Sequence, residues 1–145
     1  MRITHIETIP LLVPLAREYR GSYYRMTHRA TLIARVHTDT GLVGEAYAGD
    51  EDKTLGQIEA VVQQEITPRL IGRDPRQLAD CWETAFPVTF DILRDRRIGL
   101  VALAAVDAAL WDLYGKYVGE PLWRLWGGYR SALPMIVIGE KKRSR

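Results

Sequence analysis

Few side chains in this sequence have the types and spacing that chemistry requires. The three histidines, His5, His28 and His37, stand far apart and show none of the short spacings that are typical of metal ligands. Cys81 is the only cysteine, so it cannot form an internal disulfide, and beside Trp82 it is expected to pack as a small core residue. From these residues we assign no catalytic residue and no metal ligand.

Two acidic features allow a functional and a structural interpretation. Asp50, Glu51 and Asp52 could bind a cation, but a solvated loop before a helix, favoured by the helix dipole, explains them better. Asp107 lies inside an apolar run. We expect its carboxylate to be hydrogen-bonded to a neighbouring backbone or Arg group, because an unpaired buried charge is costly.

Residues 14–28 combine aromatic, cationic and small polar side chains. Three tyrosines and three arginines surround Gly21 and Ser22, and apolar residues follow no clear period, so we predict a long loop. Arginine pairs with carboxylates and tyrosine hydrogen-bonds to hydroxyls. For the isolated chain we prefer the simpler interpretation of a mobile polar loop without a partner.

The elements before and after this loop are predicted to be strands. Residues 2–13 are rich in Ile, Thr, Val and Leu, and residues 29–38 alternate cleanly between two faces. One face of the second strand holds Ala30, Leu32, Ala34 and Val36. A turn at 39–41 leads into a third strand at 42–47, which predicts a three-stranded antiparallel meander.

Three helices are predicted after the meander. Apolar residues recur at helical spacing over 53–70, and Asp74 is expected to cap a second helix that begins at Pro75. Asp95 is expected to cap the third, which is apolar nearly all round and ends at Gly119. We expect Leu100, Leu103, Leu110 and Tyr114 to share one buried face of it. Strands followed by helices predict an α+β fold, with a bundle of three or so helices backing the sheet.

Composition and charge exclude several classes of protein. The 145 residues are 47% hydrophobic and 26% charged, as in a soluble domain with one core. The net charge of +2 arises from four cations in the last five residues, and no basic stripe runs through the rest. We find no signal peptide, and Asp107 and Asp112 interrupt the long apolar run, so we expect a cytoplasmic protein without a membrane span.

One long run resembles a known family. Residues 104–128 read A-A-V-D-A-A-L-W-D-L-Y-G-K-Y-V-G-E-P-L-W-R-L-W-G-G. This run resembles the signature at the junction of the two domains in the mandelate racemase / muconate lactonizing enzyme group of the enolase superfamily. The resemblance implies that residues 1–128 form the N-terminal capping domain, and that residues 133–138 are the first strand of a (β/α) barrel.

The resemblance also implies an activity, a cofactor and a site. Members of the group remove a proton from the carbon next to a carboxylate, with Mg²⁺ holding the enediolate, and act as racemases, cycloisomerases or acid-sugar dehydratases. Two capping-domain loops, here residues 14–28 and 47–52, contact the distal part of a carboxylate-bearing substrate. The candidate substrate-binding residues are Tyr19, Arg20, Tyr23, Tyr24, Arg25 and Tyr47. A homo-oligomer is also implied.

The barrel that the resemblance implies would need about 200 more residues. In the family the bases and metal ligands come from the second barrel strand onward, so we expect this chain to bind no Mg²⁺ and to be inactive alone. We divide it into the capping domain 1–128, the start of a truncated barrel at 129–139 and a basic tail at 140–145. A truncated or frameshifted reading frame explains that tail. The alternatives are a non-enzymatic interaction module, or nucleic-acid binding through the tail, which we consider unlikely.

The same absence predicts an exposed apolar surface. The barrel would cover Leu122, Trp123, Trp126 and residues 136–138, and we expect these to be open to solvent here.

Overall fold

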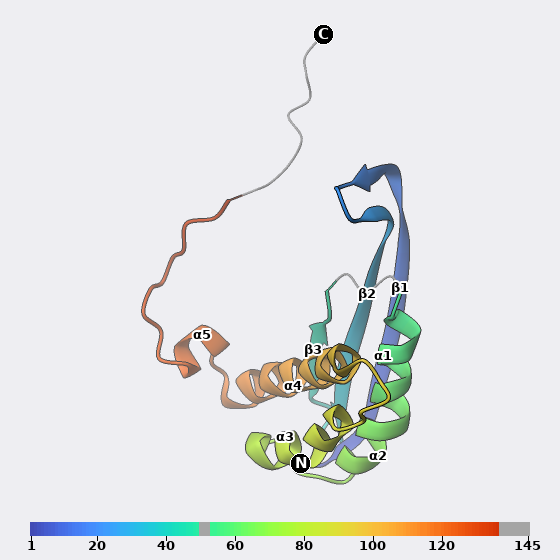
Figure 1. The fold of residues 1–145 in the computed structure, drawn as a ribbon. Coiled ribbons are helices and arrows are strands. Elements are labelled where there is room, and N and C mark those ends of the chain that lie inside the picture. Colours follow the sequence, from blue (N-terminus) through green and yellow to red (C-terminus); the bar gives the residue numbers. More distant parts are fainter. Residues whose placement is uncertain (50–52, 137–145) are drawn as a thin grey trace.

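A three-stranded antiparallel sheet lies against a layer of helices in the computed structural model, which describes residues 1–49 and 53–136 (Figure 1). The sheet order is β1-β2-β3, and the strands are β1 (Ile3–Arg20), β2 (Arg25–Thr38) and β3 (Val43–Tyr47). This arrangement confirms the predicted meander and the α+β class.

The helical layer begins with one continuous helical stretch. It consists of α1 (Leu55–Val61), a π-helical turn (Val62–Ile66) and α2 (Thr67–Leu70), and it confirms the predicted helix over 53–70. Pro68 lacks a backbone N–H and therefore interrupts the regular hydrogen-bond ladder. The Thr67 hydroxyl donates to the Val62 carbonyl at 2.9 Å, so the chain stays helical through the proline.

The remaining helices are α3 (Leu78–Ala85), a 3₁₀ turn (Phe86–Thr89), α4 (Arg96–Val118) and α5 (Leu122–Leu125). The predicted start at Pro75 is wrong, because residues 74–77 form a turn in which the Gln77 N–H donates to the Asp74 carbonyl at 3.1 Å. The predicted cap of α4 is confirmed: the Asp95 carboxylate accepts from the Arg97 N–H at 2.9 Å. Gly119 ends α4 in the left-handed region, with φ of 74°.

The predicted long loop at 14–28 is wrong. Strands β1 and β2 continue past Pro14 as an extended hairpin, and their register runs on to the pair Arg20 and Arg25. A register shift between Pro14 and Tyr19 accommodates the irregular sequence there. Both faces of the hairpin end are largely exposed, so no alternation of apolar and polar residues marks it as strand. The hairpin projects from the domain, away from α2 and α3 (Figure 1).

The core lies between the sheet and the whole helical layer, and α1, α2, α3 and α4 all contribute to it. The predicted inner face of β2, Ala30, Leu32, Ala34 and Val36, is fully buried. Leu103 and Leu110 of α4 are also buried, as predicted, but Leu100 is 41% exposed because its side of the helix has turned away from the sheet. By length and composition alone α4 could cross a membrane. However, 56% of its most apolar 18-residue stretch is buried inside the protein, as in the core helix of a globular domain.

Beyond α5 the chain leaves the helical layer (Figure 1). Residues 129–136 form neither helix nor strand, so the strand expected at 133–138 is not present over its described part. A strand needs a hydrogen-bonded neighbour, and none of the three described strands lies beside this segment. Trp123, Trp126 and Ile136 are exposed as predicted, whereas Leu122 is half-buried. Residues 137–145, and with them the basic tail, lie outside the described residues.

Candidate functional site

The end of the β1–β2 hairpin is a tight turn closed by its own residues. The Gly21 N–H donates to the Tyr24 carbonyl at 3.0 Å. The Tyr24 ring lies against Gly21 so closely that a Cβ there would be 2.2 Å from ring atom Cε1. Glycine at position 21 therefore allows the ring to fold over the turn.

Charges at the hairpin end are arranged around a single carboxylate. Glu18 pairs with Arg20 on its own strand, and its Oε2 accepts from the Arg25 Nε on the neighbouring strand at 2.6 Å. Arg20 and Arg25 are themselves cross-strand partners. Two guanidinium groups thus share one carboxylate, and the hairpin end keeps a positive charge.

An open hollow of about 1060 Å³ lies beside this hairpin end. Three separate parts of the chain line it: the hairpin residues 20–26 and His28, the pair Lys53 and Thr54 just before α1, and Arg97 in the first turn of α4. The hollow is therefore a feature of the tertiary fold, and the hairpin forms one side of it.

The structure brings together four of the six predicted site residues. Arg20, Tyr23, Tyr24 and Arg25 line the hollow, whereas Tyr19 and Tyr47 do not. The Tyr19 ring lies under the Arg17 guanidinium, 5.2 Å from its centroid. Tyr47 is exposed at the end of β3. The neighbouring residues 50–52, which the sequence offered as a cation site, lie outside the described residues.

Sequence reasoning missed several lining residues, among them Met26, His28, Lys53, Thr54 and Arg97. Lys53 directly follows the predicted acidic loop, so its place in the chain was a usable signal. No local pattern relates Arg97 to the hairpin, because α4 begins about seventy residues later and only the packed fold brings it there. The pairing of His28 is local, since its Nδ1 lies 2.8 Å from the Thr27 hydroxyl.

The other residues considered for chemistry have structural surroundings. The rings of His5 and His37 lie side by side across β1 and β2, tilted by 38° with centroids 5.5 Å apart, and His37 Nε2 lies 3.3 Å from Glu7 Oε2. Asp107 is half-buried, and its pKa is raised by burial. The hydrogen bond expected for its carboxylate is not found within residues 1–49 and 53–136. Over the same residues, no three His, Cys, Asp or Glu side chains are placed to hold a metal ion.

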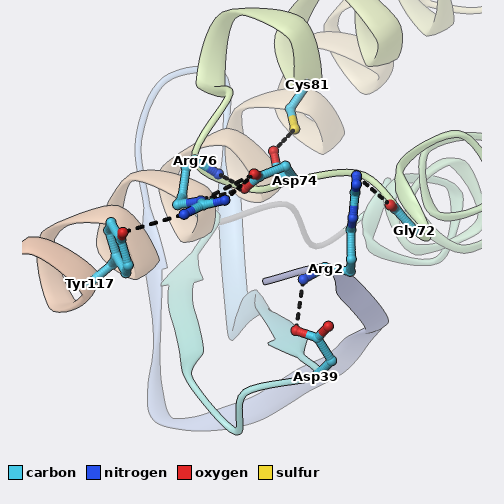
Figure 2. Close-up of polar contacts among 7 residues, drawn as sticks. All are labelled: Arg2, Asp39, Gly72, Asp74, Arg76, Cys81 and Tyr117. Atoms are coloured by element: carbon cyan, nitrogen blue, oxygen red, sulfur yellow. Dashed lines mark hydrogen bonds and ion pairs between the residues drawn. The ribbon is translucent and has the colours of Figure 1, made fainter.

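A polar network fixes the end of the domain opposite the hairpin (Figure 2). The Arg2 N–H donates to Asp39 at 2.8 Å, which ties the N-terminus to the β2–β3 turn. The Arg76 guanidinium donates two hydrogen bonds to the Asp74 carboxylate and a third to the Tyr117 hydroxyl of α4 at 3.4 Å. Its hydrogen bonds to Asp74 hold the pKa of that carboxyl well below its usual range. These contacts join the strands, the α2–α3 connection and α4, so we assign them to the scaffold and not to a site.

Cys81 belongs to the same end and is buried. Its thiol donates to the Asp74 carbonyl with a sulfur–oxygen distance of 3.7 Å (Figure 2). Burial, with a smaller effect from Asp80, raises the pKa of Cys81 to about 11. The thiol is therefore protonated at neutral pH, as a core residue should be.

This raised pKa gives a test by pH. The thiol has a pKa of about 9.0 when free, so the folded state binds its proton more tightly than the unfolded state. We expect the free energy of unfolding to fall between about pH 9 and pH 11, by at most about 1.4 kcal/mol per pH unit. Urea unfolding of the protein and of Cys81→Ala at several pH values measures it. Equal pH slopes in the two proteins would contradict the assignment.

With the fold and the hollow described, comparison with known proteins places the chain. It is an α+β domain of the kind that accompanies a barrel in two-domain enzymes. Residues 9–127 match the family model of the mandelate racemase / muconate lactonizing enzyme N-terminal domain, and the chain belongs to that family of the enolase superfamily.

Relatives and solved structures agree with this placement. The D-galactarolactone cycloisomerase of Agrobacterium fabrum is 33% identical and aligns with 99% of this chain and 37% of its own. The D-mannonate dehydratase of Novosphingobium aromaticivorans is 36% identical, and the alignment covers 76% of this chain and 26% of the length of the dehydratase. One mandelate racemase/muconate lactonizing enzyme structure is 59% identical with a TM-score of 0.91, covering 95% of this chain and 38% of that one.

A second such structure, from a marine actinobacterium, is in complex with magnesium. It is 52% identical with a TM-score of 0.85, and the match covers 97% of this chain and 36% of that one. The chain thus spans between about a quarter and two fifths of the length of the proteins it matches.

Proposed function

We propose that this chain is the capping domain of a Mg²⁺-dependent enzyme that removes a proton from the carbon next to a carboxylate. A racemase, a cycloisomerase or an acid-sugar dehydratase would each work in this way. The observation that carries the proposal is the match of residues 9–127 to the N-terminal domain of this family, and the hollow between the hairpin end, residues 53–54 and the start of α4 is where such a domain would contact the substrate. In this role the hairpin contacts the substrate at the end remote from the reacting carbon and excludes water from it.

The described residues supply binding groups and no catalytic group. Arg20 and Arg25 can donate to carboxylate oxygens, and the hydroxyls of Tyr23 and Tyr24 can bond to hydroxyls of a substrate. No described cluster of acidic or histidine side chains fits Mg²⁺, so we assign no step through the metal to this chain. Proton removal requires groups that a second domain provides, and the chain alone is proposed to be inactive.

A chimera tests the proposal. Residues 1–128 would replace the equivalent domain of the 59% identical relative, and the product would be assayed with Mg²⁺ against a panel of acid sugars. We expect activity from the chimera, and from the 145-residue chain no exchange of the proton next to the carboxylate in deuterated water. A folded chimera without activity, or proton exchange by the chain alone, would count against the assignment.

A single tyrosine locates the contact within the chimera. Tyr23 is fully exposed at the hollow, so Tyr23→Ala is expected to lower kcat/KM by about tenfold, which corresponds to about 1.4 kcal/mol of lost binding. Tyr117 lies at the far end of α4, where it is 49% exposed and its hydroxyl accepts from Arg76, and the control Tyr117→Ala should leave kcat/KM unchanged in a chimera that is folded by circular dichroism. Equal values for the two variants would show that the hollow does not face the substrate.

A further inference from the structure

One edge of the sheet is covered by side chains of α4. The Asp112 carboxylate accepts from the Glu45 N–H at 2.8 Å, and the Lys116 ammonium donates to the Val43 carbonyl at 3.0 Å. These bonds occupy backbone groups of β3 that a further strand would need. A second chain therefore cannot pair with β3 without displacing them.

The other edge of the sheet is β1, and the helical layer covers only its beginning. Ile3 exchanges two backbone hydrogen bonds with residues 72 and 73, and the Ile6 carbonyl accepts from the Gln63 side chain at 3.0 Å. The Thr8 hydroxyl donates to the Glu59 carboxylate of α1 at 3.1 Å. The strand then runs past α1 into the projecting hairpin (Figure 1), where other means must protect its edge.

The part of β1 that runs past α1 is composed like an aggregation-prone strand. Residues 8–16 read T-I-P-L-L-V-P-L-A and carry no charge, and Leu11, Leu12 and Val13 are 38%, 54% and 54% exposed. A long, apolar and uncharged edge strand is a template for pairing with another chain. Only its two prolines depart from that pattern.

The register shows which way the backbone groups of both prolines point. Pro10 lies opposite Leu32 of β2, and the Leu32 carbonyl accepts from the Ala48 N–H, on the side of β3, at 2.8 Å. Opposite residues of an antiparallel pair exchange both backbone hydrogen bonds or neither, so Pro10 and Leu32 exchange neither. The backbone of Pro10 therefore points out of the sheet, as does that of Pro14, four residues further in the same register.

We infer that Pro10 and Pro14 keep this edge of β1 from pairing with the same edge of a second copy of the chain. A second copy is the matching partner, because a two-fold antiparallel pairing would set identical uncharged runs against each other. Of the three residues that point outward between positions 9 and 15, only Leu12 has an N–H, because proline has none. The prolines thus remove donors from an intermolecular ladder and break no bond to β2.

Supplying the two missing donors tests the inference. Pro10→Thr/Pro14→Thr in the 145-residue chain should tighten self-association about tenfold, because two further N–H groups of each strand become available to the partner. Sedimentation equilibrium at several concentrations measures it, and circular dichroism checks the fold. Each single substitution supplies one donor and should give a smaller increase. Folded single or double variants that associate no more tightly than the parent would overturn the inference.

Hydrogen exchange locates the association. The Leu12 N–H points to solvent in the parent and should exchange freely, whereas in the associated double variant it should be protected by about tenfold or more. Association of that variant through the exposed apolar residues of α5 would leave the Leu12 amide unprotected, and this result would count against pairing at the edge.

Two further variants separate edge pairing from a general gain in strand propensity. Pro134→Thr makes the same chemical change within residues 129–136, which form neither helix nor strand, and it should associate as the parent does. Adding Leu12→Lys to the double variant places a charge at the edge and should return association to the parent level. Association of Pro134→Thr as tight as that of the double variant, or no relief by Leu12→Lys, would show that the prolines do not act at this edge.

Discussion

Replacing Gly44 by alanine is expected to destabilise the domain by about 3 kcal/mol or more, because the helix and the strand are in backbone contact there. Gly44 is the second residue of β3 and lies opposite Val36 of β2. A Cβ at this position would be 2.1 Å from the Ala109 carbonyl oxygen and 2.5 Å from the Leu113 Cβ, both in α4. Backbone atoms of a packed helix cannot turn aside as a flexible side chain can.

The helix also cannot move away from β3 without losing hydrogen bonds. The Asp112 carboxylate accepts from the Glu45 N–H at 2.8 Å, and the Lys116 ammonium donates to the Val43 carbonyl at 3.0 Å. These two side chains satisfy backbone groups on the outer edge of β3. Opening the contact by the distance that a methyl group needs would break both hydrogen bonds, and because both are exposed to solvent each would cost about 0.5–1.5 kcal/mol.

Chemical denaturation of Gly44→Ala measures the effect, and Gly56→Ala is its matched control. Gly56 lies in α1, and nothing stands within 4 Å of a Cβ placed there. Alanine suits a helix interior better than glycine by about 0.5–1 kcal/mol, so this variant should be as stable as the parent or more stable. Similar stabilities for the two variants would mean that α4 does not cross β3 at Gly44.

The contact at Gly44 also shows why sequence reasoning reached some features and missed others. Alternation revealed the inner face of β2, because each second residue from Ala30 to Val36 is buried under the helical layer. The caps at Asp95 and Gly119 were also predictable from sequence, because a cap bonds to residues close to it in the chain. The closeness of Gly44 to Ala109 depends on two elements that are far apart in the sequence, and no local pattern reports it.

The hairpin and the hollow were missed for related reasons. Periodicity reports burial, and the end of the hairpin is exposed on both faces, so its strands looked like a loop. The family resemblance and the residue types drew attention to the tyrosines and arginines of residues 19–25, and four of them line the hollow, but their binding role stays a prediction. Lys53 and Arg97 complete the hollow from other parts of the chain, and that meeting is a property of the tertiary structure.

Leu103→Ala is the second substitution for which we expect a large effect, a loss of about 2–5 kcal/mol in the free energy of unfolding. Leu103 is 1% exposed and belongs to the main core cluster, between α4 and the elements it packs against. Removing its three outer carbons leaves a cavity that the surrounding helix and sheet cannot close, since both are held in place by their own backbone hydrogen bonds.

Leu100→Ala is the control that distinguishes the observed helix face from the predicted one. The two leucines are three residues apart, and the sequence placed both on one buried face. In the structure Leu100 is 41% exposed, so its truncation removes little buried surface and should cost less than about 1 kcal/mol. Comparable losses for the two variants in urea unfolding would mean that α4 is rotated toward the predicted face, and that Leu100 is covered in solution.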